Sequence, residues 1–298
     1  MQKPFSVLIL GLASMLGCTL ESFAAGVETA GEVVPFKLQR GHLIAVRCSV
    51  GGIKNLIGII DTGASETVLD ITLVRKLSLA TKADRATFIT QKVEVWEVAI
   101  PGLQVGPITV DRLEGIATDL SSLTAELGIR PQVLIGMDLL HRTSFAIDYR
   151  SRRLVFGPAP LLAHNAPLVP MASEDPPWRF VLIESRIGGQ KVRLQVDSGF
   201  DGLLLYRDRL SRQIRDEGAT RAAWARSESQ VAHLGQSLMA SNFDAPSVKI
   251  GDWQAPHNQL VVDGPPPGST PFDGLIGTAF LSQRRIAFDF ENGMLYWE

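Results

Sequence analysis

The stretch IIDTGASETVL at residues 59–69 decides the fold. An apolar run over residues 56–60 ends in Asp61 and is followed at once by a hydroxyl residue, Thr62, and a glycine, Gly63. A short apolar run bounded by a turn signal is typical of a buried strand. We therefore expect Asp61 to lie at the start of a tight loop, at the end of a strand.

The same pattern occurs a second time in the chain. The stretch QVDSGFDG at residues 195–202 carries Asp197, which is 136 residues after Asp61 (197 − 61 = 136). Each copy is preceded by an alternating strand-like segment, a Gly-Gly turn and an apolar strand. In the first copy these are residues 43–49, 51–52 and 56–60, and in the second they are residues 180–185, 188–189 and 192–196. An ordered repeat of this kind indicates an internal duplication.

Later landmarks keep the same register. VLIG at residues 133–136 is matched by GLIG at residues 274–277, which is 141 positions later (277 − 136 = 141). FAIDY at residues 145–149 is matched by IAFDF at residues 286–290. Most of the remaining chain consists of short segments rich in Val, Ile and Phe, with brief helical stretches expected over residues 68–79, over residues 204–215 and after Gly136. The sequence predicts a mainly β protein with two similar halves.

These signals divide the chain into four segments. Residues 1–24 are interpreted as a signal peptide, 33–157 as an N-terminal lobe with the first acidic residue, 158–177 as a Pro-rich linker, and 178–298 as a C-terminal lobe with the second. The linker assignment rests on six prolines within 20 residues. Proline fits neither a helix interior nor a central strand, because it lacks a backbone N–H.

Two such loops, related by a pseudo-twofold axis, can place Asp61 and Asp197 face to face. Like charges that close cannot both ionise easily, so the pair shares one proton. One carboxylate can then take a proton from a bound water while the other donates to a carbonyl oxygen, which hydrolyses an amide by general acid–base catalysis. Taken singly, each Asp is better explained as a turn former. The duplicated context favours the paired site.

The residues around each Asp are suited to hold such a pair. Glycine permits a close approach that larger residues forbid, and a Thr or Ser hydroxyl can hydrogen-bond across the junction between the loops. The predicted supporting residues are Thr62, Gly63, Ser65, Ser198, Gly199 and Asp201.

With these residues in view, the chain resembles the retropepsin and pepsin superfamily of aspartic peptidases, and more closely its bacterial single-chain members. The resemblance implies a bilobal acid-protease fold made of two tandem retropepsin-like β-barrel lobes with pseudo-twofold symmetry. It also implies that the strands ending in Gly136 and Gly277 cross beneath the two loops, and that hairpin flaps lie near residues 88–91 and 233–236. Asp61 and Asp197 would be the catalytic residues.

The second loop departs from the family pattern. Phe200 and Asp201 stand where the family usually has a small residue and Ser or Thr. In the family, the residue aligned with Ser65 and Asp201 often hydrogen-bonds a catalytic carboxylate. Asp201 therefore either places a third acid near the pair or points to solvent, and the sequence leaves both readings open.

Composition excludes several other classes of protein. The formal net charge of −2 gives no electrostatic reason to expect nucleic-acid binding. The five histidines show no metal-binding spacing and no Cys pair has zinc-site spacing, so we expect no metal and no cofactor. Three further acids, Asp138, Asp148 and Asp289, are interpreted as solvated or hairpin residues. The duplication supplies both halves of the site, so a monomer is expected.

The N-terminus has the features of an export signal. Lys3 is followed by an apolar run from Phe5 to Gly17 and by small residues that suit cleavage after Ala24. The run is shorter than the roughly 20 residues that a spanning helix needs. Cys18 gives an alternative, in which it is processed as a lipoprotein cysteine and tethers the protein to lipid. Both readings predict an exported protein of the periplasm or cell envelope.

Two functional classes follow from the sequence. The first is an endopeptidase that cleaves exported or envelope proteins, with a protein or peptide as substrate. The second is a peptide-binding or scaffold protein that keeps the cleft but has lost catalysis, for which the irregular Phe200-Asp201 is the only motive. The presence of both Asp residues favours the enzyme.

Overall fold

The computed structural model describes residues 31–88, 91–157, 168–172, 179–187, 189–210, 228–233, 236–243, 248–250, 253–254, 259–262 and 271–297. The interpretation of residues 1–24, with Ala24 and Cys18, therefore lies outside the described residues. Among the helices in these ranges, none combines the length and apolar character that crossing a bilayer requires.

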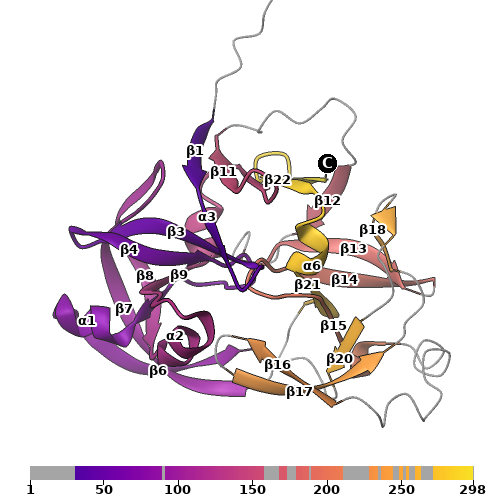
Figure 1. Ribbon diagram of the computed structural model, residues 1–298, viewed down its shortest axis with the longest axis horizontal. Helices are drawn as coiled ribbons and strands as arrows, with labels where there is room; N and C mark the ends of the chain where they lie inside the picture. Colours follow the sequence, from indigo (N-terminus) through magenta and orange to yellow (C-terminus); the bar gives the residue numbers. More distant parts are fainter. Residues whose placement is uncertain are drawn as a thin grey trace, which may run out of the picture.

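The first half of the chain forms an eight-stranded sheet with the order β2-β3-β4-β9-β5-β8-β7-β6. Its strands are β2 (Lys37–Gln39), β3 (Leu43–Val50), β4 (Ile53–Ile60), β5 (Val68–Asp70), β6 (Thr81–Phe88), β7 (Gln91–Val105), β8 (Ile108–Thr118) and β9 (Val133–Ile135), and its helices are α1 (Ile71–Lys76), α2 (Ser121–Leu127) and α3 (Met137–Leu140). We call this part lobe one. It occupies the left side of Figure 1.

The second half repeats the arrangement as lobe two, on the right of Figure 1. It contains β13 (Leu182–Ile187), β14 (Gln190–Val196), β15 (Leu203–Tyr206), the 3-10 helix η1 (Arg207–Arg209), β16 (Glu228–His233), β17 (Gln236–Phe243), β18 (Val248–Ile250), β19 (Trp253–Gln254), β20 (Gln259–Val262), β21 (Gly274–Ile276) and α6 (Thr278–Leu281). The predicted class, mainly β and bilobal, is confirmed.

A shared sheet joins the lobes. The strands β1 (Glu32–Pro35), β11 (Arg153–Phe156), β10 (Phe145–Asp148), β22 (Arg285–Asp289), β23 (Met294–Trp297) and β12 (Leu168–Ala172) follow one another in it, and we call them the interlobe sheet. Ala146 pairs with Ala287, its own counterpart in the duplication (146 + 141 = 287). The pseudo-twofold axis therefore passes through this pair of residues.

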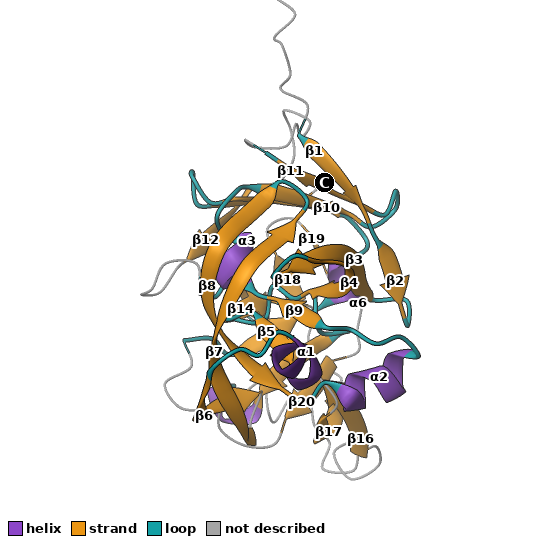
Figure 2. Cartoon of the chain, turned by 90° about the vertical axis from the view of Figure 1, so that its left-hand side faces the viewer, coloured by secondary structure: helices purple, strands orange, loops and turns teal. Residues whose placement is uncertain are grey.

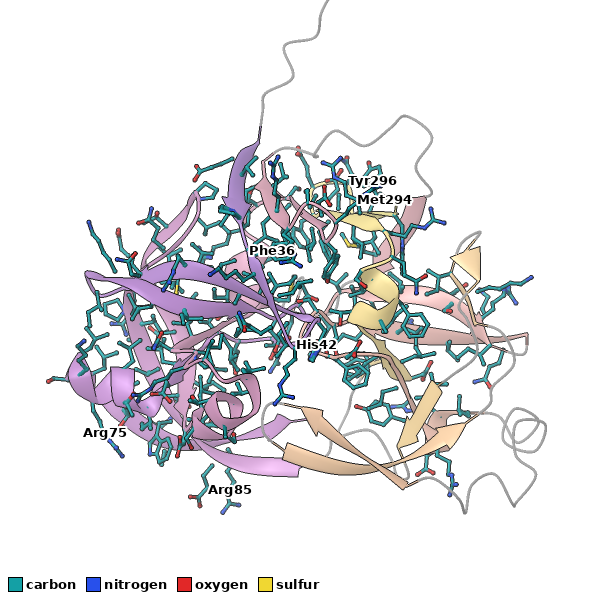
Figure 3. The ribbon with its side chains drawn as sticks, viewed as in Figure 1. Phe36, His42, Arg75, Arg85, Met294 and Tyr296 are labelled. Carbon is teal, nitrogen blue, oxygen red and sulfur yellow. The ribbon has the colours of Figure 1, made fainter. Side chains whose placement is uncertain are left out.

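The interlobe sheet also carries the central part of the hydrophobic core. Phe145 and Phe288 stack with ring centroids 4.7 Å apart, and both side chains are fully buried. Phe36 packs edge-on against Tyr149 with centroids 6.2 Å apart. Figure 3 shows Phe36 in the interior and Met294 and Tyr296 at the end of the molecule that also holds β1. One continuous core thus runs through both lobes.

Within residues 158–177, the segment interpreted as a linker, residues 168–172 form β12 inside the interlobe sheet. Leu168, Val169 and Pro170 pair with β23, and from Met171 the strand pairs with β13. Pro170 lies where the strand changes partner. A proline is tolerated there because the ladder is already interrupted.

The helical stretches expected after each acidic loop begin later than predicted, and residues 211–215 of the second stretch lie outside the described residues. Residues 68–70 and 203–206 form strands β5 and β15, and only then do α1 and η1 begin. The spacing of the apolar residues after each loop predicts a helix. They form strands because each segment pairs antiparallel with β9 or β21, and this tertiary contact overrides the local pattern.

Both segments expected to be flaps are hairpin ends. In lobe one, β6 and β7 pair from Thr81↔Val98 up to Phe88↔Gln91. In lobe two, β16 and β17 pair up to His233↔Gln236. Figures 1 and 2 place both hairpins at the end of the molecule opposite the interlobe sheet. Their function as flaps stays a prediction.

Candidate active site

The two acidic loops leave the sheets in the same way. Strand β4 runs parallel to β9, and the Asp61 N–H donates to the Ile135 carbonyl at 3.0 Å. Strand β14 runs parallel to β21, and the Asp197 N–H donates to the Ile276 carbonyl at 2.9 Å. Each Asp is thus fixed to a buried neighbouring strand at the point where its own strand ends.

Thr62 and Ser198 lock the loops to each other through four buried hydrogen bonds. The Thr62 N–H donates to Ser198 Oγ at 3.0 Å, and the Ser198 N–H donates to Thr62 Oγ1 at 2.9 Å. Thr62 Oγ1 donates to the Val196 carbonyl at 2.8 Å, and Ser198 Oγ donates to the Ile60 carbonyl at 3.0 Å. Each hydroxyl accepts one bond and donates one, so both are satisfied.

The two carboxyl groups meet at the interface between the lobes. A Cβ on Gly63 would lie 2.3 Å from the Asp197 carboxyl carbon, and a Cβ on Gly199 would lie 2.6 Å from that of Asp61. The Asp61 and Asp197 side chains are hydrogen-bonded to each other. Both are buried, at 1% and 2% exposure. We call this pair the dyad.

Backbone N–H groups hold each carboxylate in place. Asp61 Oδ1 accepts from the Gly63 N–H at 2.9 Å and from the Ala64 N–H at 3.1 Å. Asp197 Oδ1 accepts from the Gly199 N–H at 2.8 Å. Donors of this kind stabilise an ionised carboxylate and fix its orientation.

Burial dominates the electrostatics of the dyad. It raises the pKa of Asp197 from its ordinary 3.8 to about 6, while the hydrogen bonds from Gly199, Asp61 and Phe200 act in the opposite direction. Burial also raises the pKa of Tyr149 and of Tyr206, and the charge of Asp197 adds to both shifts. The dyad therefore holds a proton well above the pH at which an exposed Asp loses it.

The glycines that end β9 and β21 allow these strands to pass close to the loops. A Cβ on Gly136 would lie 2.6 Å from the carbonyl carbon of Glu66, and a Cβ on Gly277 would lie 2.3 Å from the carbonyl oxygen of Phe200. Any side chain at either position would push the backbone of a loop.

Ser65 and Asp201 do not contact the dyad among the hydrogen bonds that the structure describes. Ser65 is half-buried and Asp201 is exposed. The Thr278 hydroxyl lies 3.4 Å from Asp201 Oδ1 and donates to it. Of the two readings left open by the sequence, the structure favours the one in which Asp201 points to solvent.

The interpretation of Asp138 as a solvated residue is wrong. Its carboxylate accepts from the Thr67 N–H at 2.8 Å and from Thr67 Oγ1 at 2.7 Å. Thr67 is fully buried, and its hydroxyl accepts in turn from the Gly136 N–H at 3.2 Å. Burial raises the pKa of Asp138. This cluster ties the end of the Asp61 loop to α3, and Asp138 carried no sequence signal except its place two residues after Gly136.

Replacing Asp138 by Ala is expected to destabilise the fold by about 2–4 kcal/mol, because two buried donors of Thr67 lose their partner. Asp148→Ala is the matched control. Asp148 accepts from the exposed Ser151 N–H in a hairpin turn, and its replacement should cost about 1 kcal/mol or less. Urea unfolding of both variants measures the difference. Equal losses would contradict the assigned importance of the Thr67–Asp138 contact.

Gln195 is a second residue that sequence reasoning missed. Its side chain is 2% exposed, and its Nε2 donates to the Gly63 carbonyl in the other lobe at 2.8 Å. A polar residue two positions before Asp197, at the site matched by Ile59 in lobe one, was the available signal.

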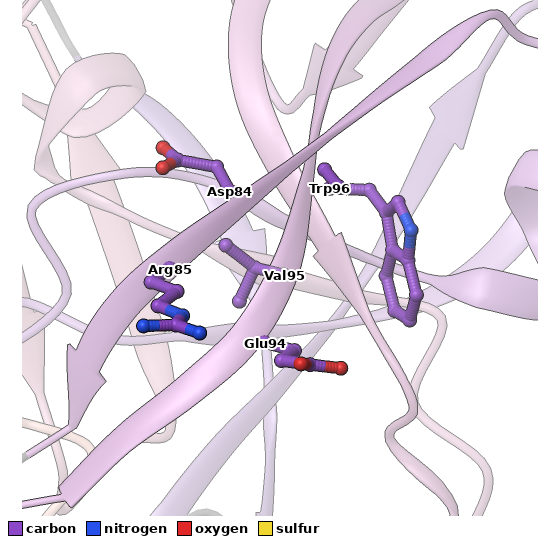
Figure 4. Close-up of a pocket in the computed structure, with 6 residues that line it drawn as sticks. Asp84, Arg85, Glu94, Val95 and Trp96 are labelled. Carbon is purple, nitrogen blue, oxygen red and sulfur yellow. The ribbon is translucent and has the colours of Figure 1, made fainter.

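A cavity of about 430 Å³ lies on the β6–β7 hairpin of lobe one. Asp84, Arg85, Glu94 and Trp96 line it together with Ala83 and Val95, as Figure 4 shows. It belongs to the hairpin rather than to the loops of the dyad. Within the described part of the chain, no group of three or more His, Cys, Asp or Glu side chains is arranged to hold a metal ion.

Part of the chain is similar to a known family, and the whole chain is similar in fold to a solved structure. Residues 46–139 match the sequence model of a family described as aspartyl protease. No curated protein sequence matches the chain. Among solved structures, conglutin gamma, a unique basic 7S globulin from lupine seeds, matches with a TM-score of 0.52 and 11% identity, over 90% of this chain and 94% of that one. Basic 7S globulin from soybean matches with a TM-score of 0.46 and 12% identity, over the same shares.

At 11% identity, the lupine match bears on the fold alone. The family match covers the segment that holds Asp61, Gly63 and Gly136, and lobe two carries the counterparts Asp197, Gly199 and Gly277. Residues 46–139 are thus similar to the aspartyl protease family, in a chain whose overall fold is similar to that of the lupine protein.

Proposed function

We propose that the protein is an aspartic endopeptidase, in which Asp61 and Asp197 activate one water molecule for attack on a peptide bond. The observation that carries this proposal is the reciprocal placement of the carboxyl groups, each against the glycine of the other loop and hydrogen-bonded to its partner. Two carboxyl groups in contact that share a proton supply both a base and an acid.

The chemistry follows from the unequal protonation of the dyad. The ionised carboxylate accepts a proton from water as the oxygen attacks the carbonyl carbon. The protonated carboxyl donates its proton to the carbonyl oxygen, so no negative charge builds up in the buried site. Collapse of the resulting tetrahedral species then needs one further proton transfer, to the leaving nitrogen. The rigid Thr62–Ser198 link keeps the two groups in place throughout.

The fold by itself does not decide between catalysis and binding, since the matched solved structure is described as a globulin. The test is to incubate residues 25–298 with a peptide library between about pH 3.5 and pH 7.5, a range that spans ordinary carboxyl pKa values and the raised value of Asp197. The double variant Asp61→Asn/Asp197→Asn serves as the blank. Defined products from the native chain alone support the proposal, while binding of peptides by both chains without cleavage supports a scaffold.

We also propose that the substrates are exported or envelope proteins. The leader-like run from Phe5 to Gly17 and the cleavage signal ending at Ala24 support this. Intact mass of the N-terminal peptide, purified from cells, distinguishes a free end after Ala24 from an acylated Cys18.

The pH dependence should follow Asp197. Because its pKa in the fold is raised above the unfolded value, the stability it contributes is complete below about pH 4 and is lost as pH rises through about 6. Cleavage needs the same proton, so kcat/KM should fall over the same range. Thermal unfolding of the native chain and of Asp197→Asn at pH 4, 5, 6 and 7 checks the first point. The stability of the native chain relative to Asp197→Asn should fall steadily from pH 4 to about pH 6 and level off above it, and a constant difference would refute the assignment.

A further inference from the structure

Each lobe buries a small apolar cluster, and the two clusters share several matching positions. In lobe one a buried apolar cluster contains Leu43, Ala45, Ile59, Val68 and Leu134. In lobe two the counterparts Phe180, Leu182, Leu204 and Leu275 form a second cluster. The counterpart of Ile59 is Gln195 (195 − 59 = 136), a buried polar residue where the duplication predicts an apolar one.

Gln195 is connected to Asp61 through a single peptide group. Its Nε2 donates to the Gly63 carbonyl at 2.8 Å. The N–H of the same peptide unit belongs to Ala64, and it donates to Asp61 Oδ1 at 3.1 Å. One planar amide therefore receives a hydrogen bond from lobe two on one side and gives one to Asp61 on the other.

The hydrogen bond from Gln195 affects the hydrogen bond that the Ala64 N–H gives to Asp61. A donor on the carbonyl polarises the peptide group and strengthens the hydrogen bond that its N–H gives, most of all in a buried site of low dielectric. A stronger hydrogen bond to Oδ1 stabilises the ionised form of Asp61. In lobe two the Phe200 N–H bonds Asp197 in the matching way, but the matching side chain is Ile59, which has no donor.

We propose that Gln195 is a positioning residue that makes the dyad asymmetric: acting through the Gly63–Ala64 peptide, it stabilises the ionised form of Asp61, and the matching Ile59 gives Asp197 no such support. The catalytic use of this asymmetry rests on the proposed function. The asymmetry itself is a property of the folded chain and does not depend on cleavage.

Two tyrosines among the described residues interact electrostatically with Asp197. They are Tyr149, which follows β10, and Tyr206, which ends β15. Both have raised pKa values and stay neutral where the dyad titrates, so neither adds a charge to it. Burial raises the pKa of Asp197, and its hydrogen bond with the Asp61 side chain lowers it.

The test is the carboxyl titration of the dyad, followed by carbon-13 NMR of Asp-labelled protein. Gln195→Met keeps the length of the side chain and removes the donor, and Ile59→Met is the matched control in lobe one. In Gln195→Met the titration of the Asp61 carboxyl carbon should rise by about half to one pH unit, and in Ile59→Met this step should stay in place. An unchanged step in Gln195→Met, or an equal rise in both variants, would overturn the proposal.

A converse variant keeps the idea testable if Gln195→Met does not fold. By the pseudo-twofold relation, Ile59→Gln places a donor toward the Gly199 carbonyl and should lower the titration of the Asp197 carboxyl carbon, while an unchanged Asp197 titration would count against the proposal. NMR reports on the dyad without any cleavage, so a failure of the proposed function leaves these outcomes readable. Where cleavage is found, the acidic limb of kcat/KM should move upward in Gln195→Met, a change that loss of rigidity alone would not produce.

Discussion

Replacing Asp61 or Asp197 by asparagine is expected to lower kcat/KM for peptide cleavage by about a thousandfold or more, because each variant removes one of the two proton-transfer groups. The amide is nearly isosteric with the carboxyl group, so the Thr62–Ser198 link and the loop backbone remain in place. The single variants should be nearly as inactive as the double one, since both groups act in the same step.

The matched control is Asp201→Asn. Asp201 lies four residues after Asp197 and is exposed, and its described side-chain partner is the Thr278 hydroxyl. Cleavage by this variant should remain within about threefold of the native rate, because surface changes away from the site have small effects. Initial rates with a single fluorogenic peptide measure all three variants. Full activity in Asp61→Asn or Asp197→Asn would remove the dyad mechanism.

Substituting alanine for Gly63 or Gly199 is expected to be nearly as damaging, for a steric reason. The added Cβ would lie 2.3–2.4 Å from the carboxyl atoms of Asp197 in the first case, and 2.6–2.7 Å from those of Asp61 in the second. The carboxyl group must therefore move by roughly 1 Å, and displacement on that scale costs about a hundredfold in rate. We expect at least that loss of kcat/KM, with a fall in thermal stability because the dyad lies in a close-packed interface.

The control variant Gly41→Ala distinguishes the effect of a steric clash with the dyad from the effect of backbone strain. Gly41 has φ +82°, and nothing lies within 4 Å of its Cβ position. Alanine there should cost about 1 kcal/mol of stability through strain and leave kcat/KM unchanged. Gly63→Ala with native activity would show that the lobes can separate at the dyad without loss of function.

Much of the fold could be predicted from the sequence because the duplication repeats its signals. Asp61 and Asp197, with the strands that precede them and the glycines that end β9 and β21, sit in two copies of one pattern, and each copy supports the interpretation of the other. The local sequence pattern was less informative where pairing with distant strands determines the structure. Residues 168–172 contain a proline and still form a strand, because β23 and β13 lie on its two sides.

Some residues of the candidate site could likewise be predicted from the sequence, and others could not. Thr62 and Ser198 were predictable, since a hydroxyl beside each Asp has one evident partner across a twofold axis. Asp138 and Gln195 were not, because their partners Thr67 and Gly63 are 71 and 132 residues away in the sequence. Nothing in a single carboxylate or amide side chain specifies which distant backbone group it will meet.

The sequence by itself therefore determined the duplicated β architecture and the two acidic residues of the candidate site, because periodicity and repetition are properties of the chain alone. Only the tertiary structure decided that these two residues are buried against each other and which contacts hold the loops in place. Burial, the carboxyl–carboxyl hydrogen bond and the peptide between Gln195 and Asp61 arise when two distant segments pack together, and their strength depends on the low dielectric that packing creates.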